Sequence, residues 1–405
     1  MFGAMSDEPV VIRNYLYGDD TLCTLDVLRA LGAGVDVQPH ELIIRGVGLR
    51  QPLMTTNELL YVGNSGTLMR LLPGWLAGQP GGRWTLDGDE SIRRRPVDRI
   101  AEPLRIMGAK VEMAEGGRSP FTVEGAELHG IDYTAPVASG QVKTCVLIAG
   151  LLADGTTRFT EPSQSRDHTE RILLRSRVPF ERDGLTTCVS ATDELELDDV
   201  VVPGDPSSAA FFVAAAAIVP GSRIVIEGVG LNWTRTAFFR IAERMGAVVI
   251  GDPEEPGTVT GEEPIGELDV AQATLSGTVV EGQEIPLAID ELPLVALLGV
   301  FAEGETVIRD AAELRLKETD RIEAVVEGLR RLGAEIEAIE DGLVVQGTGE
   351  LRGGVFESRG DHRMAMLGAV AGLASREGVE VEGMAAASVS YPAFENDLSS
   401  LVTGS

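Results

Sequence analysis

The chain has 405 residues, enough for two or three domains, and its 44% hydrophobic and 24% charged residues are ordinary for a globular protein. The formal net charge of -29 at pH 7 argues against nucleic acid and anionic membranes as partners, because both are negatively charged. No apolar run approaches the length of a membrane span, and the start is too short and too acidic for a targeting peptide, so we expect a cytoplasmic protein.

The chain begins with MFGAMSDEPVVIRNYL, a pattern typical of the end of an apolar helix, a polar turn and an alternating strand. A first repeated phrase then follows: a helix ending in Leu or Met, the pair Gly-Ala, and a strand. Glycine at that position suits a left-handed helix C-terminus. The four copies place this residue at Gly32, Gly108, Gly246 and Gly333.

A second phrase consists of a small or polar head, a helix that is apolar nearly all round, and a strand. Such helices are expected to be buried, and their N-terminal heads favour anions. The five heads are residues 65–67, 139–141, 207–208, 290–291 and 361–363. We interpret MFGAM as the tail of a sixth copy that lacks its head, and therefore expect a start codon farther upstream.

Two sets of repeated units predict an α/β protein with two similar domains, each with buried helices inside sheets. The stretch VVVPGDPSS breaks regular structure at Pro203 and Gly204, so we expect domains at 1–203 and 204–405, with the active-site cleft between them.

The first half places cations near its helix heads. In GDESIRRRP, Arg93, Arg94 and Arg95 precede Pro96, which fits the first position of a helix. A solvated basic run is the alternative, but in so acidic a chain the cluster favours anion binding.

The motifs SGQVKTC and SRDHTER add Gln141, Lys143, Ser165 and Arg166. We interpret His168 as a hydrogen-bonded structural residue, since nothing in the sequence gives it a second partner.

The second half adds ELRLKETDRIEAV and RGDHRMAM. If the first of these is helical, Lys317 and Arg321 share a face and Glu318 lies three residues before Arg321, although an exposed salt-bridge ladder has the same pattern. Arg363 stands just before a buried helix, where an unpaired guanidinium would be costly. Asp290 is a candidate general base. We expect these groups to close on two anionic groups.

Six motifs resemble, in order and spacing, the signatures of the 5-enolpyruvylshikimate-3-phosphate synthase (3-phosphoshikimate 1-carboxyvinyltransferase) family: GNSGTLMRL, GDESIRRRP, SGQVK, SRDHTE, LRLKETDRIEA and GDHRMAM. The resemblance extends to SYPAFENDL near the C-terminus. It implies the enolpyruvyl transferase fold, a two-domain inside-out α/β barrel built from repeated βαβαββ units. The implied reaction moves the enolpyruvyl group of phosphoenolpyruvate to the 5-hydroxyl of shikimate 3-phosphate, in the shikimate pathway to chorismate and aromatic amino acids.

The resemblance also implies roles for individual residues. Asp290 and Glu318 correspond to the catalytic residues, which move protons at the 5-hydroxyl and at the phosphoenolpyruvate methylene. The phosphoenolpyruvate contacts correspond to Gly66, Arg95, Gln141, Arg321 and Arg363. The shikimate 3-phosphate contacts correspond to Ser139, Gln141, Ser165, Arg166, Asp290 and Lys317. No cofactor and no metal are implied. Cys23, Cys145 and Cys188 show no metal-ligand spacing, so we expect reduced thiols. Separately, we expect the protein to be a monomer.

Two features depart from the family pattern. Gly140 stands where many members have Ser, and the family's KSISHR-like segment, which binds both substrates, is absent from the start. Two alternatives therefore stay open: an N-terminally shortened paralogue that only binds a ligand or partner, and UDP-N-acetylglucosamine enolpyruvyl transferase, which shares the fold. The latter should carry a catalytic Cys near EMAEGGRSPF, where this chain has none.

Overall fold

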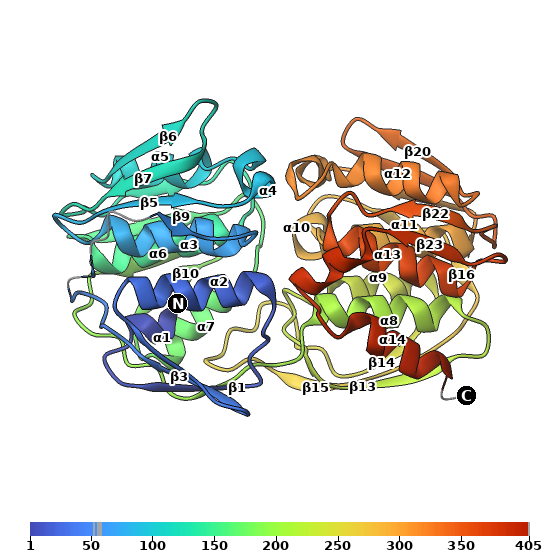
Figure 1. The fold of residues 1–405 in the computed structure, drawn as a ribbon, viewed down its shortest axis with the longest axis horizontal. Coiled ribbons are helices and arrows are strands. Elements are labelled where there is room, and N and C mark those ends of the chain that lie inside the picture. Colours follow the sequence, from blue (N-terminus) through green and yellow to red (C-terminus); the bar gives the residue numbers. More distant parts are fainter. Residues whose placement is uncertain (52, 55–58, 404–405) are drawn as a thin grey trace. The chain divides into compact units, whose positions relative to one another are not determined.

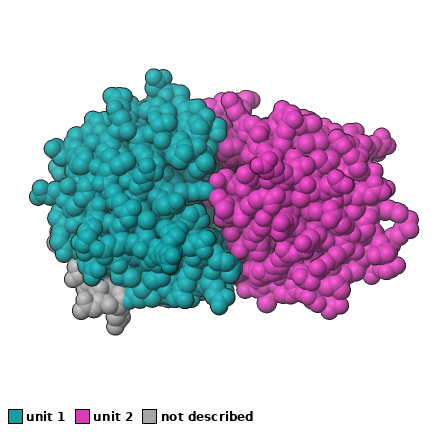
Figure 2. Space-filling model, turned by 90° about the horizontal axis from the view of Figure 1, so that it is seen from above, with its two compact units in different colours: residues 1–202, 259–262 teal, residues 203–258, 263–405 magenta. Residues whose placement is uncertain are grey.

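The computed structural model describes residues 1–51, 53–54 and 59–403, and the chain divides into two compact units (Figures 1 and 2). Unit 1 consists of residues 1–202 and 259–262, and unit 2 consists of residues 203–258 and 263–405. The first passage between the units lies at Val202 and Pro203. None of the described helices is both long and apolar enough to cross a membrane.

Unit 1 alternates short strands with helices. Its elements are α1 (Phe2–Met5), β1 (Val10–Arg13), α2 (Asp19–Ala30), β2 (Gly34–Val37), β3 (Glu41–Arg45), β4 (Leu60–Tyr61), α3 (Gly66–Ala77), β5 (Arg83–Asp87), α4 (Glu90–Arg94), α5 (Asp98–Ile106), β6 (Lys110–Ala114), β7 (Arg118–Glu124), β8 (Asp132–Thr134), α6 (Gly140–Leu152), β9 (Thr156–Thr160), α7 (His168–Arg175), β10 (Phe180–Asp183), β11 (Thr186–Ser190) and β12 (Val200–Val201). The opening segment is a short buried helix followed by a strand, as its pattern predicts.

The sheets of unit 1 share one arrangement, a parallel pair followed by two antiparallel strands. Their orders are β12-β1-β3-β2, β4-β5-β7-β6 and β8-β9-β11-β10. The same order in each sheet is the structural counterpart of the repeats in the sequence.

The helices α3 and α6 form the centre of unit 1 and pack against each other (Figure 1). A side chain at Gly74 would place its Cβ 2.2 Å from the Cys145 carbonyl oxygen, so glycine permits this close approach. α3 also packs on β5 and β7, and α6 on β9 and β11. All residues of α6 from Val142 to Leu152 are buried, as expected for a helix that is apolar nearly all round.

Unit 2 follows the same plan. Its elements are α8 (Pro206–Ile218), β13 (Arg223–Gly230), α9 (Ala237–Met245), β14 (Val248–Ile250), β15 (Ile265–Ala271), β16 (Leu275–Ser276), β17 (Val279–Val280), α10 (Glu284–Ala288), α11 (Leu292–Phe301), β18 (Ala302–Glu303), β19 (Glu305–Ile308), η1 (Ala312–Leu316), α12 (Arg321–Arg331), β20 (Glu335–Ile339), β21 (Gly342–Gln346), β22 (Gly354–Glu357), α13 (His362–Leu373), β23 (Val379–Glu382), η2 (Met384–Val389) and α14 (Phe394–Thr403). Its sheets have the orders β13-β15-β14, β17-β19-β21-β20, β16-β18 and β22-β23.

Three buried helices, α8, α11 and α13, pack pairwise at the centre of unit 2 (Figure 1). Each has strands on its outer side: α8 packs on β13 and β15, α11 on β19 and β21, and α13 on β22 and β23. Helices inside and sheets outside bring the N-termini of the apolar helices into one part of each unit, where their polar heads can meet.

The four predicted glycines after the amphipathic helices have left-handed backbone conformations. Their φ angles are +106° at Gly32, +113° at Gly108, +106° at Gly246 and +103° at Gly333. These values confirm the helix ends that the sequence predicts, because a residue with a Cβ atom rarely adopts this conformation.

Candidate active site

The head of α3 is the first part of the candidate site in unit 1. Ser65 caps the helix, because its hydroxyl oxygen accepts a hydrogen bond from the Leu68 amide at 3.2 Å. Gly66 is the first helical residue and is buried. A Cβ atom at Gly66 would lie 2.3 Å from Nη1 of Arg95, so this glycine and the arginine are direct neighbours.

The three consecutive arginines have different surroundings. Asp89 caps α4 by accepting a hydrogen bond from the Ile92 amide, and the helix ends at Arg94, so Arg95 is its C-cap. The expectation that Pro96 begins a helix is therefore wrong: it lies between α4 and α5, because the Asp89 cap starts a helix before the arginines. Arg93 pairs with Asp87.

Of the arginine run, Arg94 is exposed and Arg95 is buried. Arg95 Nη2 donates to the Ser91 hydroxyl at 3.2 Å and to Asn64 Oδ1 at 3.4 Å. These two contacts hold its guanidinium beside the first turn of α3.

Gln141 and the α6 head lie next to α3. Ser139 caps α6 by accepting a hydrogen bond from the Val142 amide at 3.4 Å. The Gln141 side chain accepts a hydrogen bond from Arg70 Nη1 at 2.8 Å and donates one to the Thr67 hydroxyl at 3.1 Å. Sequence reasoning missed Arg70. The available signal was a guanidinium one turn after Gly66 on an otherwise apolar helix.

Ser165 and Arg166 precede α7. A Cβ atom at Gly140 would lie 3.3 Å from the Arg166 Cβ, so this segment runs beside the α6 head. The Ser165 hydroxyl is buried, and it has no hydrogen-bond partner among the described residues. His168 is the first residue of α7. The structure thus brings Gly66, Arg95 and Gln141 together around α3, with Ser139, Ser165 and Arg166 around the start of α6.

Asp290 is the centre of the candidate site in unit 2. Its Oδ1 atom accepts hydrogen bonds from Lys317 Nζ at 3.1 Å and from Arg321 Nη1 at 3.2 Å. Arg363 Nη2 lies 3.9 Å from Oδ2, and Arg363 Nη1 donates to the Asp290 carbonyl oxygen at 3.3 Å. Three cations therefore meet at one carboxylate, two from the segment that joins η1 to the start of α12 and one from the head of α13.

Lys317 and Glu318 do not lie on a helix, so the shared helical face considered for Lys317 and Arg321 in the motif ELRLKETDRIEAV does not form. Asp320 caps α12 by accepting a hydrogen bond from the Glu323 amide, so the helix begins only at Arg321. Lys317 instead follows the 3₁₀ turn η1 in an extended conformation. Glu318 still pairs with Arg321, at 2.6 Å between Oε2 and Nη2.

Arg321 is 1% exposed and is surrounded by carboxylates. Besides Asp290 and Glu318 it contacts Asp361, from Nε to Oδ2 at 2.8 Å and from Nη2 to Oδ1 at 3.2 Å. Burial alone would lower the pKa of Arg321, but these three carboxylates outweigh it and raise the pKa. Burial alone would raise the pKa of Asp361, whereas the Arg321 guanidinium holds it below its ordinary value.

The head of α13 supplies the remaining groups of unit 2. Asp361 caps the helix by accepting a hydrogen bond from the Arg363 amide at 2.9 Å, so Arg363 lies within the first turn rather than just before it. Burial lowers the pKa of His362 to about 4, which keeps this imidazole neutral at pH 7. Glu291, which is buried, lies 3.4 Å from Arg363 Nη1.

Sequence reasoning also missed Arg235. Its Nη2 atom donates to Asp205 Oδ1 and to the Ser207 hydroxyl, both at 2.7 Å, at the head of α8. Burial alone would lower the pKa of Arg235, but Asp205, Glu291 and Asp290 raise it. The sequence carries little signal for this contact, because Arg235 is thirty residues away from Asp205 along the chain.

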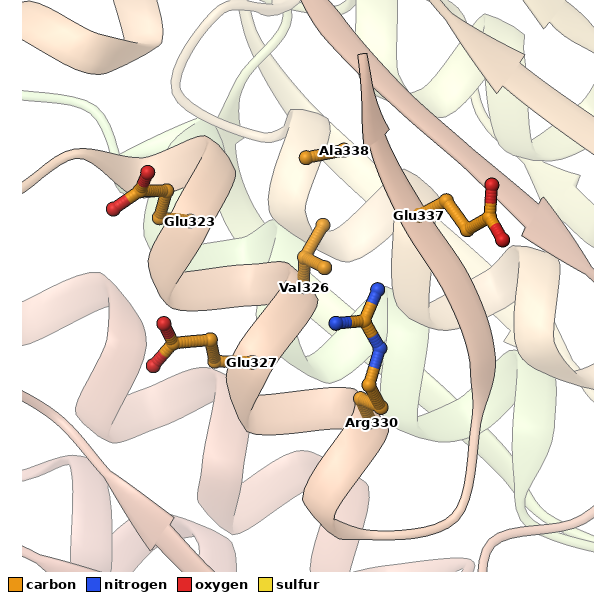
Figure 3. A pocket seen from close by; sticks show the side chains of 6 residues that line it. All are labelled: Glu323, Val326, Glu327, Arg330, Glu337 and Ala338. Carbon is orange, nitrogen blue, oxygen red and sulfur yellow. The ribbon is translucent and has the colours of Figure 1, made fainter.

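A pocket of about 380 Å³ lies elsewhere on unit 2, between α12 and β20 (Figure 3). It is lined by Glu323, Val326, Glu327, Arg330, Glu337 and Ala338, and includes none of the predicted site residues. Arg330 is engaged with the Ile336 carbonyl oxygen. Three carboxylates and one engaged cation make this pocket unsuitable for a phosphate or carboxylate ligand.

No group of three or more His, Cys, Asp or Glu residues in the described part of the chain is arranged to hold a metal ion. The charged groups of the candidate site instead pair with one another. Their chemistry is that of anion binding by guanidinium and ammonium groups, with two acidic side chains, Asp290 and Glu318, placed among the cations.

Comparison with known proteins gives a consistent result over nearly the whole chain. Residues 1–398 match the family model for EPSP synthase (3-phosphoshikimate 1-carboxyvinyltransferase). A 3-phosphoshikimate 1-carboxyvinyltransferase from Bacillus subtilis (strain 168) is 46% identical over 403 residues, with 99% of this chain and 93% of the relative covered. The enzyme of the same name from Geobacillus kaustophilus (strain HTA426) is 45% identical over 410 residues, which covers 99% of this chain and 94% of the relative.

A solved structure is also similar to this chain. The 2.37 Å structure of EPSP synthase from Acinetobacter baumannii superposes with a TM-score of 0.83 at 39% sequence identity. The superposition covers 98% of this chain and 90% of that one.

Proposed function

This chain belongs to the EPSP synthase family, and from that premise we propose how its own residues perform the family's reaction. The protein is a transferase. It moves the enolpyruvyl group of phosphoenolpyruvate to the 5-hydroxyl of shikimate 3-phosphate and releases phosphate, a step in the biosynthesis of aromatic amino acids.

In unit 1, the proposed phosphoenolpyruvate contacts lie at the head of α3. Gly66 leaves room for the ligand beside the α3 N-terminus, where backbone N–H groups favour an anion, and Arg95 and Gln141 contact it from the same side. Arg321 and Arg363 supply the cations of unit 2. These arginines neutralise the carboxylate and phosphate of the substrate through charge-assisted hydrogen bonds.

Shikimate 3-phosphate is held by a second set of residues. Ser139, Ser165 and Arg166 contact its phosphate, and the buried Ser165 hydroxyl gains a partner when a phosphate oxygen binds. Gln141, Lys317 and Asp290 orient the ring and its 5-hydroxyl. A phosphate group and a ring with several hydroxyls match this mixture of cations and hydroxyl groups.

In the addition step the 5-hydroxyl oxygen attacks C2 of phosphoenolpyruvate. Asp290 takes the hydroxyl proton, Glu318 delivers a proton to C3, and a tetrahedral intermediate forms. As Asp290 is protonated it loses its negative charge, so Lys317, Arg321 and Arg363 no longer need to balance it. These cations can then stabilise the negative charge on the intermediate.

In the elimination step the same groups act in reverse. Glu318 takes a proton from C3, and the bond between C2 and the phosphate oxygen breaks. The leaving phosphate takes up the proton that Asp290 accepted from the 5-hydroxyl, so Asp290 is a carboxylate again and the enolpyruvyl ether is complete. Arg321, which holds Glu318 at 2.6 Å, keeps the carboxylate beside the reacting carbon in both steps. The observation that carries this proposal is the convergence of Lys317, Arg321 and Arg363 on Asp290.

The reaction is tested by measuring phosphate release from phosphoenolpyruvate with one of two acceptors, shikimate 3-phosphate or UDP-N-acetylglucosamine. We expect release only with shikimate 3-phosphate, together with a product whose mass equals that acceptor plus one enolpyruvyl group. Binding of shikimate 3-phosphate without phosphate release would instead indicate a paralogue that does not turn over. Release with the sugar nucleotide would overturn the substrate assignment.

We further expect the protein to act as a monomer in the cytoplasm. Light scattering after size-exclusion chromatography measures the first of these: a mass near the 43.0 kDa of one chain supports it, and twice that mass contradicts it.

A further inference from the structure

Lys143 is a charged group that the proposed reaction does not use, although it lies in the first turns of α6. It is 0% exposed, and its Nζ atom lies 3.0 Å from Glu161 Oε2 and 2.8 Å from Glu170 Oε1. Both carboxylates are also buried. A buried ammonium is tolerated only with such partners, so this network is a built feature of unit 1 and not a surface ion pair.

The three residues come from separate segments that hold proposed shikimate 3-phosphate contacts. Lys143 is on the same helical turn as Ser139 and Gln141. Glu161 follows β9, and Glu170 lies in α7, so these two residues bracket the stretch that contains Ser165 and Arg166. The Lys143 ammonium therefore fixes both ends of the segment 161–170, which contains Ser165 and Arg166, to the helix α6, whose head contains Ser139 and Gln141.

A further hydrogen bond, made by Thr144, joins α6 to α7. The Thr144 hydroxyl donates to the Gly140 carbonyl oxygen at 2.7 Å and is also hydrogen-bonded to the Thr169 hydroxyl, at 2.5 Å. Glu161 Oε1 and Glu170 Oε2 are buried with no hydrogen-bond partner in the described part of the chain. The Lys143 ammonium is therefore the main group that compensates these two carboxylates, and the arrangement depends on it.

From this geometry we propose that Lys143, with Glu161 and Glu170, is a positioning residue for the shikimate 3-phosphate site. It contacts no substrate. It holds the α6 head and the segment 161–170 at the separation that Ser139, Ser165 and Arg166 need to bind one phosphate group. This inference rests on the proposed function, because it names how that site is built. Displacements near 1 Å in such a site cost up to about 100-fold in function.

The test compares two variants that differ in the charge left behind. Lys143→Met removes the ammonium and leaves two buried carboxylates that repel each other, so it should lower the melting temperature. The triple variant Lys143→Met, Glu161→Gln, Glu170→Gln removes all three charges and should recover much of that stability. Both should raise the Kd of shikimate 3-phosphate in isothermal titration calorimetry by about tenfold or more, which corresponds to ~1.4 kcal/mol.

The matched control is Lys110→Met. Lys110 also lies near two carboxylates, 3.1 Å from Glu112 and 3.2 Å from Glu124, but this group is exposed. Its Kd should stay within about twofold of the parent value, as expected for a surface ion pair.

Steady-state kinetics separates a positioning role from a loss of stability, because it measures KM and kcat independently. The triple variant should raise KM for shikimate 3-phosphate more than it lowers kcat, because the reacting groups Asp290 and Glu318 are untouched. A triple variant that binds shikimate 3-phosphate as tightly as the parent would overturn the positioning role and leave the proposed function intact. A parent chain that does not bind shikimate 3-phosphate would overturn the proposed function and this inference with it.

Discussion

Gly66→Ala adds one methyl group beside the arginine proposed to bind phosphoenolpyruvate. The new Cβ atom would lie 2.3 Å from Arg95 Nη1, whereas ordinary van der Waals contact begins at 3.4 Å. The guanidinium must therefore move by about 1 Å. Its present contacts with Ser91 and Asn64, at 3.2 and 3.4 Å, are already long and would be lost first.

We expect this movement to raise KM for phosphoenolpyruvate by roughly 10–100-fold, since a displacement of about 1 Å in a substrate-positioning group costs up to about 100-fold. The Kd of shikimate 3-phosphate should hardly change, because Arg95 is not among its contacts. The substitution should not lower thermal stability by weakening α3, because Ala is a better helix former than Gly.

The assay is phosphate release over a range of phosphoenolpyruvate concentrations at saturating shikimate 3-phosphate. Gly140→Ala is the matched control, since its Cβ atom would lie 3.3 Å from the Arg166 Cβ and needs a shift of only tenths of an ångström. If Gly66→Ala kept KM for phosphoenolpyruvate within about twofold of the parent, Arg95 would not be a phosphoenolpyruvate ligand and the reasoning would be refuted.

Three further predictions concern unit 2. Arg321→Gln leaves the buried Asp361 without its guanidinium and should lower the free energy of unfolding in urea by about 3–5 kcal/mol; a loss below ~1 kcal/mol would contradict this pairing. Arg363→Ala should raise KM for phosphoenolpyruvate by roughly 10–100-fold, as for a lost charge-assisted contact, and an unchanged KM would remove Arg363 from the site. Because burial lowers the pKa of His362 from 6.5 to about 4, the unfolded chain binds more protons between these pH values. The free energy of unfolding should therefore fall by roughly 3 kcal/mol as the pH falls from 6.5 to 4, and His362→Gln should flatten this dependence; an unchanged slope would assign it to other groups.

The sequence predicted features that depend on local chemistry. Three of the buried helices begin at their predicted heads, as Ser65, Ser139 and Asp361 each cap their helix with a side-chain oxygen. In contrast, α8 begins before its predicted head at 207–208, because Asp205 caps it. The glycines at helix ends have the predicted left-handed conformation, because this conformation is decided by the residue itself.

Helix starts near the candidate site were predicted less well. Asp89 caps α4, so a helix begins before the arginines and not at Pro96, where the sequence pattern predicts it. Asp320 caps α12, so that helix begins at Arg321 and does not include Lys317. A capping aspartate competes with neighbouring signals, and a single sequence does not say which one prevails.

The partners of charged residues could not be predicted, because they come from distant segments. Arg321 and Asp361 are forty residues apart, and Arg70 and Gln141 are seventy-one apart. Such pairs depend on how the repeated units stack, and spacing along the chain carries no signal for them. The roles of the individual site residues likewise stay predictions, which rest on the resemblance and on the contacts described above.

The most direct test of the central claim is the kcat of Asp290→Asn, measured by phosphate release at saturating phosphoenolpyruvate and shikimate 3-phosphate. An amide keeps the shape of the side chain but cannot take the proton of the 5-hydroxyl. We predict that kcat falls by roughly 10²–10⁴-fold while shikimate 3-phosphate still binds, and that the exposed control Asp252→Asn retains full activity. An Asp290→Asn variant with most of the parent kcat would contradict the assignment of Asp290 as the base.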